Sequence, residues 1–192
     1  MCPTRIEGIE KMKKIIFVFV GFTISLLAFN DCNSSHSQDD RQQQSLTNNK
    51  KSELSDCYDK ITKCSQKMQE EAKSYFSKTH FNIRTTDGDF TNIGNIYPTA
   101  VVALSEALNK GMHIDDFLST IKQGEKVIAN LQEIDGKCYH IERYCSDGIK
   151  QLENDRLYLT TSIKDGWISV LKRIKNYSSE IREQVQKIRE LQ

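Results

Sequence analysis

The sequence predicts an all-α fold, a small bundle of four to five helices that closes with a long C-terminal helix. Only two prolines and nine glycines occur in 192 residues, and these two residue types are the ones that helix interiors disfavour most. Apolar residues recur at three- and four-residue spacing over most of the chain, which is the period of an amphipathic helix. No alternating strand pattern of useful length and no internal repeat is found in the sequence.

The start of the chain predicts an export signal. Lys13 and Lys14 precede a mostly apolar run, residues 15–29, in the order of the basic and hydrophobic parts of a secretory signal peptide. The run is short for a bilayer span. Because Met12 stands directly before the lysine pair, we expect translation to start there and residues 1–11 to lie upstream of the true start.

Cys32 is the predicted lipidation site, which makes residues 1–31 the signal peptide. An apolar run that ends at a cysteine is typical of a bacterial lipoprotein, although residues 29–31 are not the small residues that usually precede that cysteine. The alternatives are ordinary cleavage, with Cys32 as a spare thiol, and an uncleaved anchor. Residues 32–50 are polar, with Leu46 as their one large apolar residue, and predict a flexible tether.

Residues 51–192 are expected to form one helical, ligand-binding domain. Removal of the signal leaves 161 residues, a length that suits a single core. The whole chain has a formal charge of +1, and without the signal 23 basic and 23 acidic residues remain. A neutral domain without a dense basic stripe is not expected to bind nucleic acid.

The apolar stripes also predict the extent of each helix. Pro98 suits the first turn of a helix, Gly111 is expected to stop that helix, and Asp147-Gly148 is expected to break or kink the next one. From Trp167 onward the spacing approaches a heptad, which favours a long terminal helix. The expected helices are 51–78, 98–109, 115–145 and 149–191.

Four cysteines predict two disulfides between helices. Cys57 and Cys64 are seven residues apart, as are Cys138 and Cys145, so each pair lies on one helix face, about 10.5 Å apart. That distance excludes a bridge within a pair. Antiparallel helices would pair Cys57 with Cys145 and Cys64 with Cys138. A parallel arrangement, pairing Cys57 with Cys138 and Cys64 with Cys145, is the fallback, and four buried free thiols are the remaining alternative.

The segment 78–98 is predicted to be a long loop that contacts a partner. Loops of this length between helices are usually functional or disordered, and this one mixes aromatic and aliphatic residues with charges, as interfaces do. The alternative is that its apolar residues fold back onto the helices. The proposed binding residues are Phe90, Ile93 and Tyr97 as anchors and Arg84, Asp87 and Asp89 as orienting charges.

No catalytic, metal or cofactor motif is recognised in the sequence. The four histidines are scattered, without the i, i+4 pairing of a metal-binding helix. Asp87-Gly88-Asp89 begins like a calcium loop, but Asn92 stands where that loop needs glycine and Pro98 where it needs an acid. We therefore expect neither an enzyme nor a bound cofactor. The basic residues of the terminal helix are a second candidate face, although such charges are usually a solvated helix side.

The chain resembles the factor H-binding surface lipoproteins of relapsing-fever Borrelia, the FhbA/HcpA type. The resemblance lies in the signal Lys-Lys-Ile-Ile-Phe-Val-Phe at residues 13–19, in the Asp31-Cys32 pair, in the Ser- and Gln-rich tether and in the helical domain. It implies a lipid-anchored protein of the outer membrane that recruits host complement factor H to the cell surface. Some relatives also bind plasminogen. No binding residue is transferred from the family.

Two other functions fit the same features. A variable or adhesin-like helical surface lipoprotein would share the anchor and the helices but bind another ligand or shield the cell. A periplasmic structural lipoprotein would stay beneath the outer membrane. The sequence leaves both open.

Overall fold

A computed structural model describes residues 37–192 except 81, 85–88 and 156–160, and gives the backbone alone at 37–46, 83–84 and 161. The chain divides into two compact units, residues 1–39 and 40–192, and the bundle described below belongs to the second unit. The predicted signal peptide and the lipidation site Cys32 lie outside the described residues.

The all-α prediction is confirmed for the described residues, where four long helices dominate. They are α1 (Ser37–Phe76), α3 (Pro98–Lys122), α4 (Val127–Asn154) and α5 (Thr161–Leu191). A small β-hairpin and a one-turn helix, which the sequence pattern did not predict, stand between α1 and α3. They are β1 (Asn82–Arg84), β2 (Phe90–Asn92) and α2 (Ile93–Ile96).

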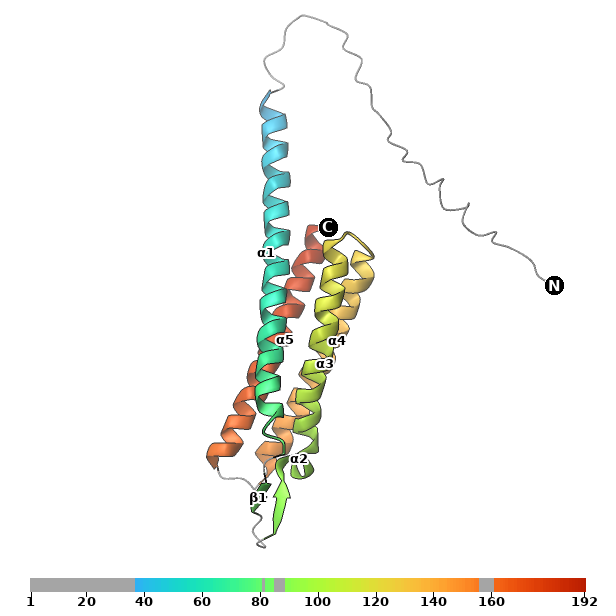
Figure 1. The fold of residues 1–192 in the computed structure, drawn as a ribbon. Helices are drawn as coiled ribbons and strands as arrows, with labels where there is room; N and C mark the ends of the chain where they lie inside the picture. The colour runs from blue at the N-terminus through green and yellow to red at the C-terminus, as the bar shows by residue number, and fades with distance from the viewer. Residues whose placement is uncertain (1–36, 81, 85–88, 156–160) are drawn as a thin grey trace, which may run out of the picture. The chain divides into compact units, whose positions relative to one another are not determined.

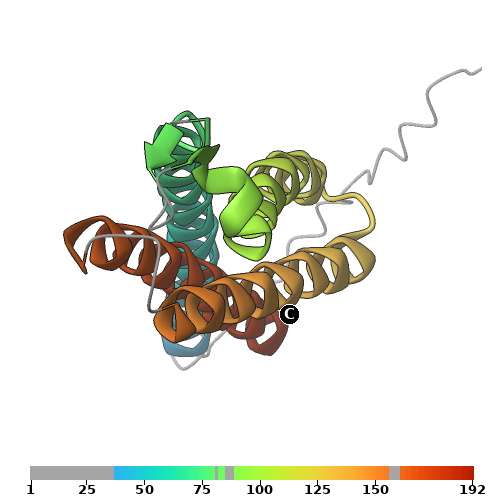
Figure 2. The same cartoon turned by 90° about the horizontal axis from the view of Figure 1, so that it is seen from below.

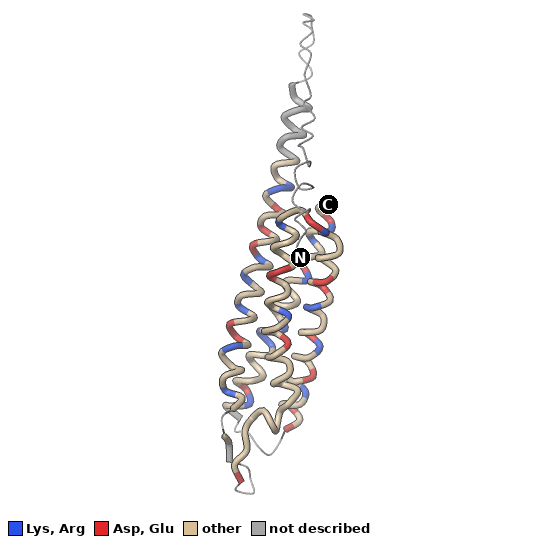
Figure 3. Tube along the Cα trace, turned by 45° about the vertical axis from the view of Figure 1, so that its right-hand side comes forward, with Lys and Arg blue, Asp and Glu red and all other residues tan. Residues whose placement is uncertain are grey.

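Successive long helices run in opposite directions (Figure 1), so α1 and α4 are parallel to each other. Viewed along the bundle in Figure 2, α3 and α5 lie between them. Side-chain contacts agree with this order: Arg173 of α5 binds Glu71 of α1, and Arg182 of α5 binds Asp135 of α4. Acidic and basic residues are interspersed along the helices (Figure 3), as expected for a neutral domain.

The core follows heptad spacing, because residues at alternating steps of three and four lie along one helix face. On α5 the heptad pattern predicted from Trp167 onward is confirmed, since each of its core positions is buried. These positions are Trp167, Leu171, Ile174, Ser178, Ile181, Val185 and Ile188. On α4 the matching buried positions are Leu131, Ile134, Cys138, Ile141, Cys145, Gly148 and Leu152.

The predicted stop at Gly111 is wrong, because α3 continues through it to Lys122. Gly111 instead lies against α1, where its carbonyl oxygen accepts a hydrogen bond of 3.2 Å from Ser65. A Cβ at this position would come within 2.6 Å of the Gln69 side chain. The glycine is therefore explained by a close helix contact. The chain turns later, at Gly124 with φ of 80° and Lys126 with φ of 45°.

The predicted break at Asp147-Gly148 is also absent, since α4 continues to Asn154. A Cβ on Gly148 would lie 3.0 Å from the Cα of Ala100 and 3.1 Å from Leu171 Cδ1. Gly148 is thus the residue that lets α3 and α5 approach α4 closely.

The predicted flexible tether, residues 32–50, is only partly compatible with the structure, because α1 begins at Ser37. The chain from there to Lys50 contains no glycine, proline or β-branched residue except Thr47, so nothing in it stops a helix. A helix that is anchored further along by tertiary packing can extend into such a polar segment. Residues 47–50 are exposed.

The four cysteines are free and buried in the structure. Their seven-residue spacing is the heptad period, so each occupies a core position and packs as a small apolar side chain. Burial raises the pKa of Cys64, Cys138 and Cys145 to about 12 in each case. These three thiols are therefore protonated at neutral pH.

The predicted pairing of Cys57 with Cys145 does not fit the helix directions, because it required α1 and α4 to be antiparallel. Cys57 lines a cavity together with Lys187 of α5, whereas Cys145 interacts electrostatically with Lys175 of the same helix. These two lysines are twelve residues apart, about 18 Å along the helix. The two fallback pairs are also offset along the bundle. Cys64 bonds Glu180 and Cys138 bonds Ser178 on the same turn of α5, so Cys64 is level with Cys138 and not with Cys145.

Candidate binding site at the hairpin end

The segment that the sequence assigned to a long binding loop forms a short β-hairpin followed by α2. β1 and β2 pair antiparallel, with Asn82 opposite Asn92 and Arg84 opposite Phe90. We call this hairpin, α2 and the adjoining ends of α1 and α5 the hairpin end. It lies at the lower end of the bundle in Figure 1, where α1 finishes.

Local hydrogen bonds attach the hairpin end firmly to the bundle. Thr79, 3% exposed, donates from Oγ1 to the carbonyl of Phe76 at 2.8 Å. Its own carbonyl accepts from the amide of Gly94 at 3.1 Å, which joins the end of α1 to α2. Asn92 caps α2, since its side-chain oxygen accepts from the amide of Asn95 at 2.9 Å. One backbone hydrogen bond and two that involve side chains thus fix the chain where it leaves β2.

A cavity of about 490 Å³ opens between the hairpin and the N-terminal part of α5. Its volume is within the range of small-ligand and side-chain pockets. Its lining combines aromatic, aliphatic and polar side chains with one lysine. The lining residues are Tyr75, Lys78, Asn82, Ile93, Ser162, Ile163, Gly166 and Trp167.

Aromatic contacts shape one wall of this cavity. The rings of Tyr75 and Trp167 meet edge to face, with centroids 5.6 Å apart and planes at 85°. The Nζ of Lys78 lies 3.8 Å from the centre of the Tyr75 ring, a cation–π distance. The wall therefore presents an apolar surface with a positive charge at its edge. The sequence analysis placed Trp167 at the start of the heptad of the terminal helix, and no spacing signal connected Trp167 or Tyr75 with the loop.

Two of the predicted binding residues, Asp89 and Phe90, are exposed in the structure. Phe90 is 73% exposed, the largest exposure among the large exposed hydrophobic residues of the described chain. Asp89 beside it is exposed as well. Arg84 belongs to β1 and lies opposite Phe90 in the register, while Asp87 lies outside the described residues.

Two predicted anchors, Ile93 and Tyr97, are corrected by the structure. Ile93 is 4% exposed and Tyr97 is 1% exposed, so both are part of the protein's own core. The alternative in which apolar loop residues fold back onto the helices applies to this pair. The reason is tertiary: α2 turns the chain inward directly after β2, and Tyr97 precedes the first turn of α3.

The second candidate face, on the terminal helix, is largely engaged within the bundle. Arg173 makes two contacts to Glu71 of α1, at 2.8 and 3.0 Å. Lys172 lies 3.8 Å from Glu153 of α4. These side chains therefore connect α5 with α1 and α4.

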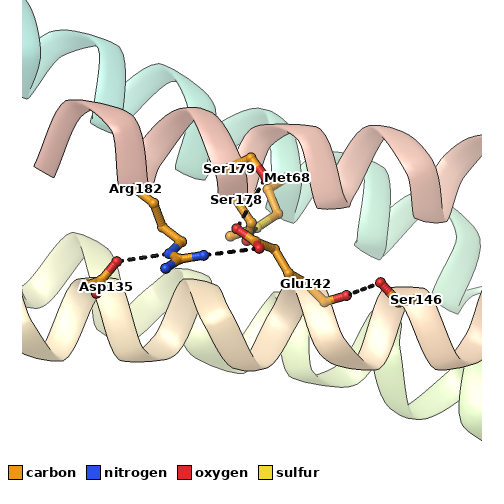
Figure 4. Close-up of polar contacts among 7 residues, drawn as sticks. All are labelled: Met68, Asp135, Glu142, Ser146, Ser178, Ser179 and Arg182. Atoms are coloured by element: carbon orange, nitrogen blue, oxygen red, sulfur yellow. Dashed lines mark hydrogen bonds and ion pairs between the residues drawn. The ribbon is translucent and has the colours of Figure 1, made fainter. Parts of the chain in front are cut away.

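The best-connected member of that face is Arg182, which bridges two acids of α4 (Figure 4). Its Nε is 2.8 Å from Asp135 and its Nη1 is 3.2 Å from Glu142. Hydrogen bonding to Asp135 is the main cause that raises the pKa of Arg182 above its ordinary value. Nearby, buried Ser178 donates to the sulfur of Met68 at 3.7 Å. This network connects α5 with α4 and α1.

The described residues include no group of three or more potential metal ligands. Among the helices that the structure describes, none combines the length and apolar character needed to cross a membrane. Comparison with protein families, curated proteins and solved structures found no match. The class that the fold defines is an all-α bundle with a hairpin at one end.

Proposed function

We propose that this protein is a lipid-anchored lipoprotein of the bacterial outer surface, which binds host complement factor H through its hairpin end. The observation that carries the proposed site is Phe90, a large aromatic residue 73% exposed on a paired hairpin that leads directly into α2, whose Gly94 amide bonds the carbonyl of Thr79. An aromatic anchor on a rigid base loses little conformational entropy on docking. The choice of factor H as ligand comes from the family resemblance.

The order of segments along the chain supports presentation of the hairpin away from a membrane. The proposed anchor, Cys32, precedes α1, and the hairpin follows it. α1 contains 40 residues, a length of about 60 Å. A protein anchored at Cys32 would therefore have a long helix between its lipid and its binding residues.

The proposed mechanism is recruitment without chemistry by the lipoprotein. Factor H held at the surface would suppress complement deposition there. Phe90 would supply most of the binding free energy, Asp89 and Arg84 would orient the partner, and the cavity beside Tyr75 would accept a side chain of the ligand. Plasminogen is a further proposed partner, for which exposed lysines are the usual contact.

A capture experiment tests this proposal. Residues 40–192, the compact unit, are immobilised and exposed to serum, with the Phe90→Ala and Ile128→Ala variants beside them. Ile128 is 68% exposed and lies in the first turn of α4, at the opposite end of the bundle, so it controls for loss of any exposed apolar group. We expect wild type and Ile128→Ala to capture factor H and Phe90→Ala to capture much less. Absence of factor H from the wild-type eluate would refute the function, and equal capture by both variants would refute the site.

The anchor and the location are tested in cells. Growth with labelled fatty acid should label the protein, and Cys32→Ala should abolish the label. Protease added to intact cells should cut a surface protein and spare a periplasmic one. Protection from protease would favour the periplasmic structural lipoprotein, whereas surface exposure without factor H binding would favour an adhesin-like or variable lipoprotein.

One disulfide remains part of the proposal, because export exposes thiols to oxidising conditions. Cys64 and Cys138 are at the same level of the bundle, because Cys64 bonds Glu180 and Cys138 bonds Ser178 on one turn of α5. Peptide mapping without reductant should recover a cross-link between them. Free thiols at both positions would reject it.

A further inference from the structure

A second cavity, of about 300 Å³, lies between α1 and the C-terminal part of α5, at the end of the bundle remote from the hairpin. Cys57 and Gln184 line it together with charged residues of both signs. This cavity is not part of the proposed factor H site, and packing of the core does not explain it.

Cys57 is 6% exposed and lines this cavity. The other three described cysteines are buried as well, and burial raises their pKa values. The nearest core cysteine on the same helix, Cys64, is two turns away, about 10.5 Å, which is too far for a disulfide. Among the described residues, Cys57 therefore has no other cysteine at its own level of the bundle.

Gln184 supplies a second, independent observation. The residue is 6% exposed, and its side-chain oxygen has no hydrogen-bond partner among the described residues. A buried amide oxygen without a donor costs stability, since it has lost its hydrogen bonds to water. A ligand that brings an N–H group to this wall of the cavity would satisfy it.

The charges around the cavity define the kind of ligand. Lys60 and Lys187 offer partners for a carboxylate, and Glu53 and Glu190 offer partners for an ammonium group. Lys187 is already held by Glu183 at 2.7 Å, which leaves Lys60 as the more available cation. Cations and anions around one small cavity complement a zwitterion better than they complement a simple anion or an apolar molecule.

We propose that this cavity is a thiol–disulfide exchange site, in which Cys57 forms a mixed disulfide with a small zwitterionic aminothiol. The co-reactant is the corresponding low-molecular-weight disulfide, such as cystine. Cys57 loses its proton to solvent, and its sulfur attacks one sulfur of that disulfide. The new bond to Cys57 forms as the old S–S bond breaks, and the departing thiolate takes a proton from solvent. The ammonium group of the bound half is placed to donate to Gln184.

The test uses the reduced full-length protein and two probes, cystine and the neutral 2-hydroxyethyl disulfide. Intact mass and peptide mapping measure the rate of adduct formation at each cysteine, and the urea-unfolded chain gives the intrinsic preference between the probes. Among the four cysteines of the bundle, we expect an adduct at Cys57 alone in the folded protein, with a preference for cystine above that of the unfolded chain. Cys57→Ser should remove the adduct, and Cys145→Ser, at a cysteine that is fully buried, should leave it in place.

Two further variants separate binding from simple exposure of a thiol. Gln184→Leu and Lys60→Gln should each slow the reaction with cystine about two- to fivefold, the scale of one polar contact, without changing the rate with the neutral probe. The proposal is overturned if no adduct forms at Cys57 or if the folded and unfolded chains show the same preference. Conversion to a disulfide-linked dimer in place of the adduct would also overturn it. Helicity and melting temperature confirm that each variant is folded.

Discussion

At the middle of the bundle, α1, α4 and α5 meet around Ser178, which is fully buried, and heptad side chains fill the space between them. At the hairpin end, two three-residue strands hold Phe90 with 73% of its surface exposed. The first region buries apolar surface that stabilises the fold, whereas the second leaves apolar surface available to a partner. Because the two regions lie far apart, stability and binding should respond to different substitutions.

The largest expected effect on stability is at Ile141, a core position of α4 that is fully buried. Ile141→Ala should lower the free energy of unfolding by about 2–5 kcal/mol, because it removes apolar contacts and leaves a cavity. Urea denaturation followed by circular dichroism measures the change. Ile128→Ala, on the same helix but 68% exposed, should change it by less than about 0.5 kcal/mol. Similar losses for both variants would contradict the assigned core.

Two glycines of α4 are expected to respond in opposite directions. Gly148→Ala should destabilise the protein by about 1–3 kcal/mol, because the new methyl group meets the backbone of Ala100. Gly136 has no neighbour within 4 Å of an added Cβ, so Gly136→Ala should stabilise the helix by about 0.5–1 kcal/mol. Thermal melts of both variants measure these two changes in stability. A stabilising Gly148→Ala would mean that α3 and α4 are not packed this closely.

Substitution of Phe90 is expected to affect binding and to leave stability almost unchanged, which is the reverse of the expectation for Ile141. Phe90→Ala should weaken binding of the proposed partner by about 2 kcal/mol, mainly through faster dissociation. Its unfolding free energy should stay within about 0.5 kcal/mol of wild type, since so exposed a ring contributes little to the core. Surface plasmon resonance and urea denaturation on one preparation give both values. A large loss of stability would show that Phe90 contributes to the folded core and is not only part of a binding surface.

The smallest of these expected effects is a reduction of the free energy of unfolding on substitution of Arg182. Its contacts to Asp135 and Glu142 are partly exposed, so Arg182→Gln should cost about 0.5–1 kcal/mol, and less at high salt. Unfolding curves at two salt concentrations test this. A cost that does not fall with salt would indicate that the loss comes from packing of the arginine stem.

Local patterns in the sequence were sufficient to predict that the domain is helical and which faces of its helices are buried. The heptad from Trp167 to Ile188 has every core position buried in α5, because the period of a helix depends only on neighbouring residues. The same reasoning failed at Gly111 and Gly148. A glycine at a close helix contact and a glycine at a helix end look alike until the partner helix is known.

The candidate site could be predicted from sequence only in outline. The apolar and charged composition of residues 78–98 located it, and Phe90 is indeed exposed. Ile93 and Tyr97 have similar side chains but are buried. Which residues face outward depends on how α2 turns the chain back against the bundle, and residue type does not encode that turn.

The sequence by itself determined the helical class, the seven-residue periodicity of the cysteines and the neutral charge of the domain, since these are properties of composition and local spacing. Only the tertiary structure decided that α1 and α4 are parallel, which separates Cys57 from Cys145 and leaves Cys57 beside Gln184 in a cavity. The physical reason is that helix direction and level follow from the lengths of the connections and from packing between distant segments. No local pattern contains that information.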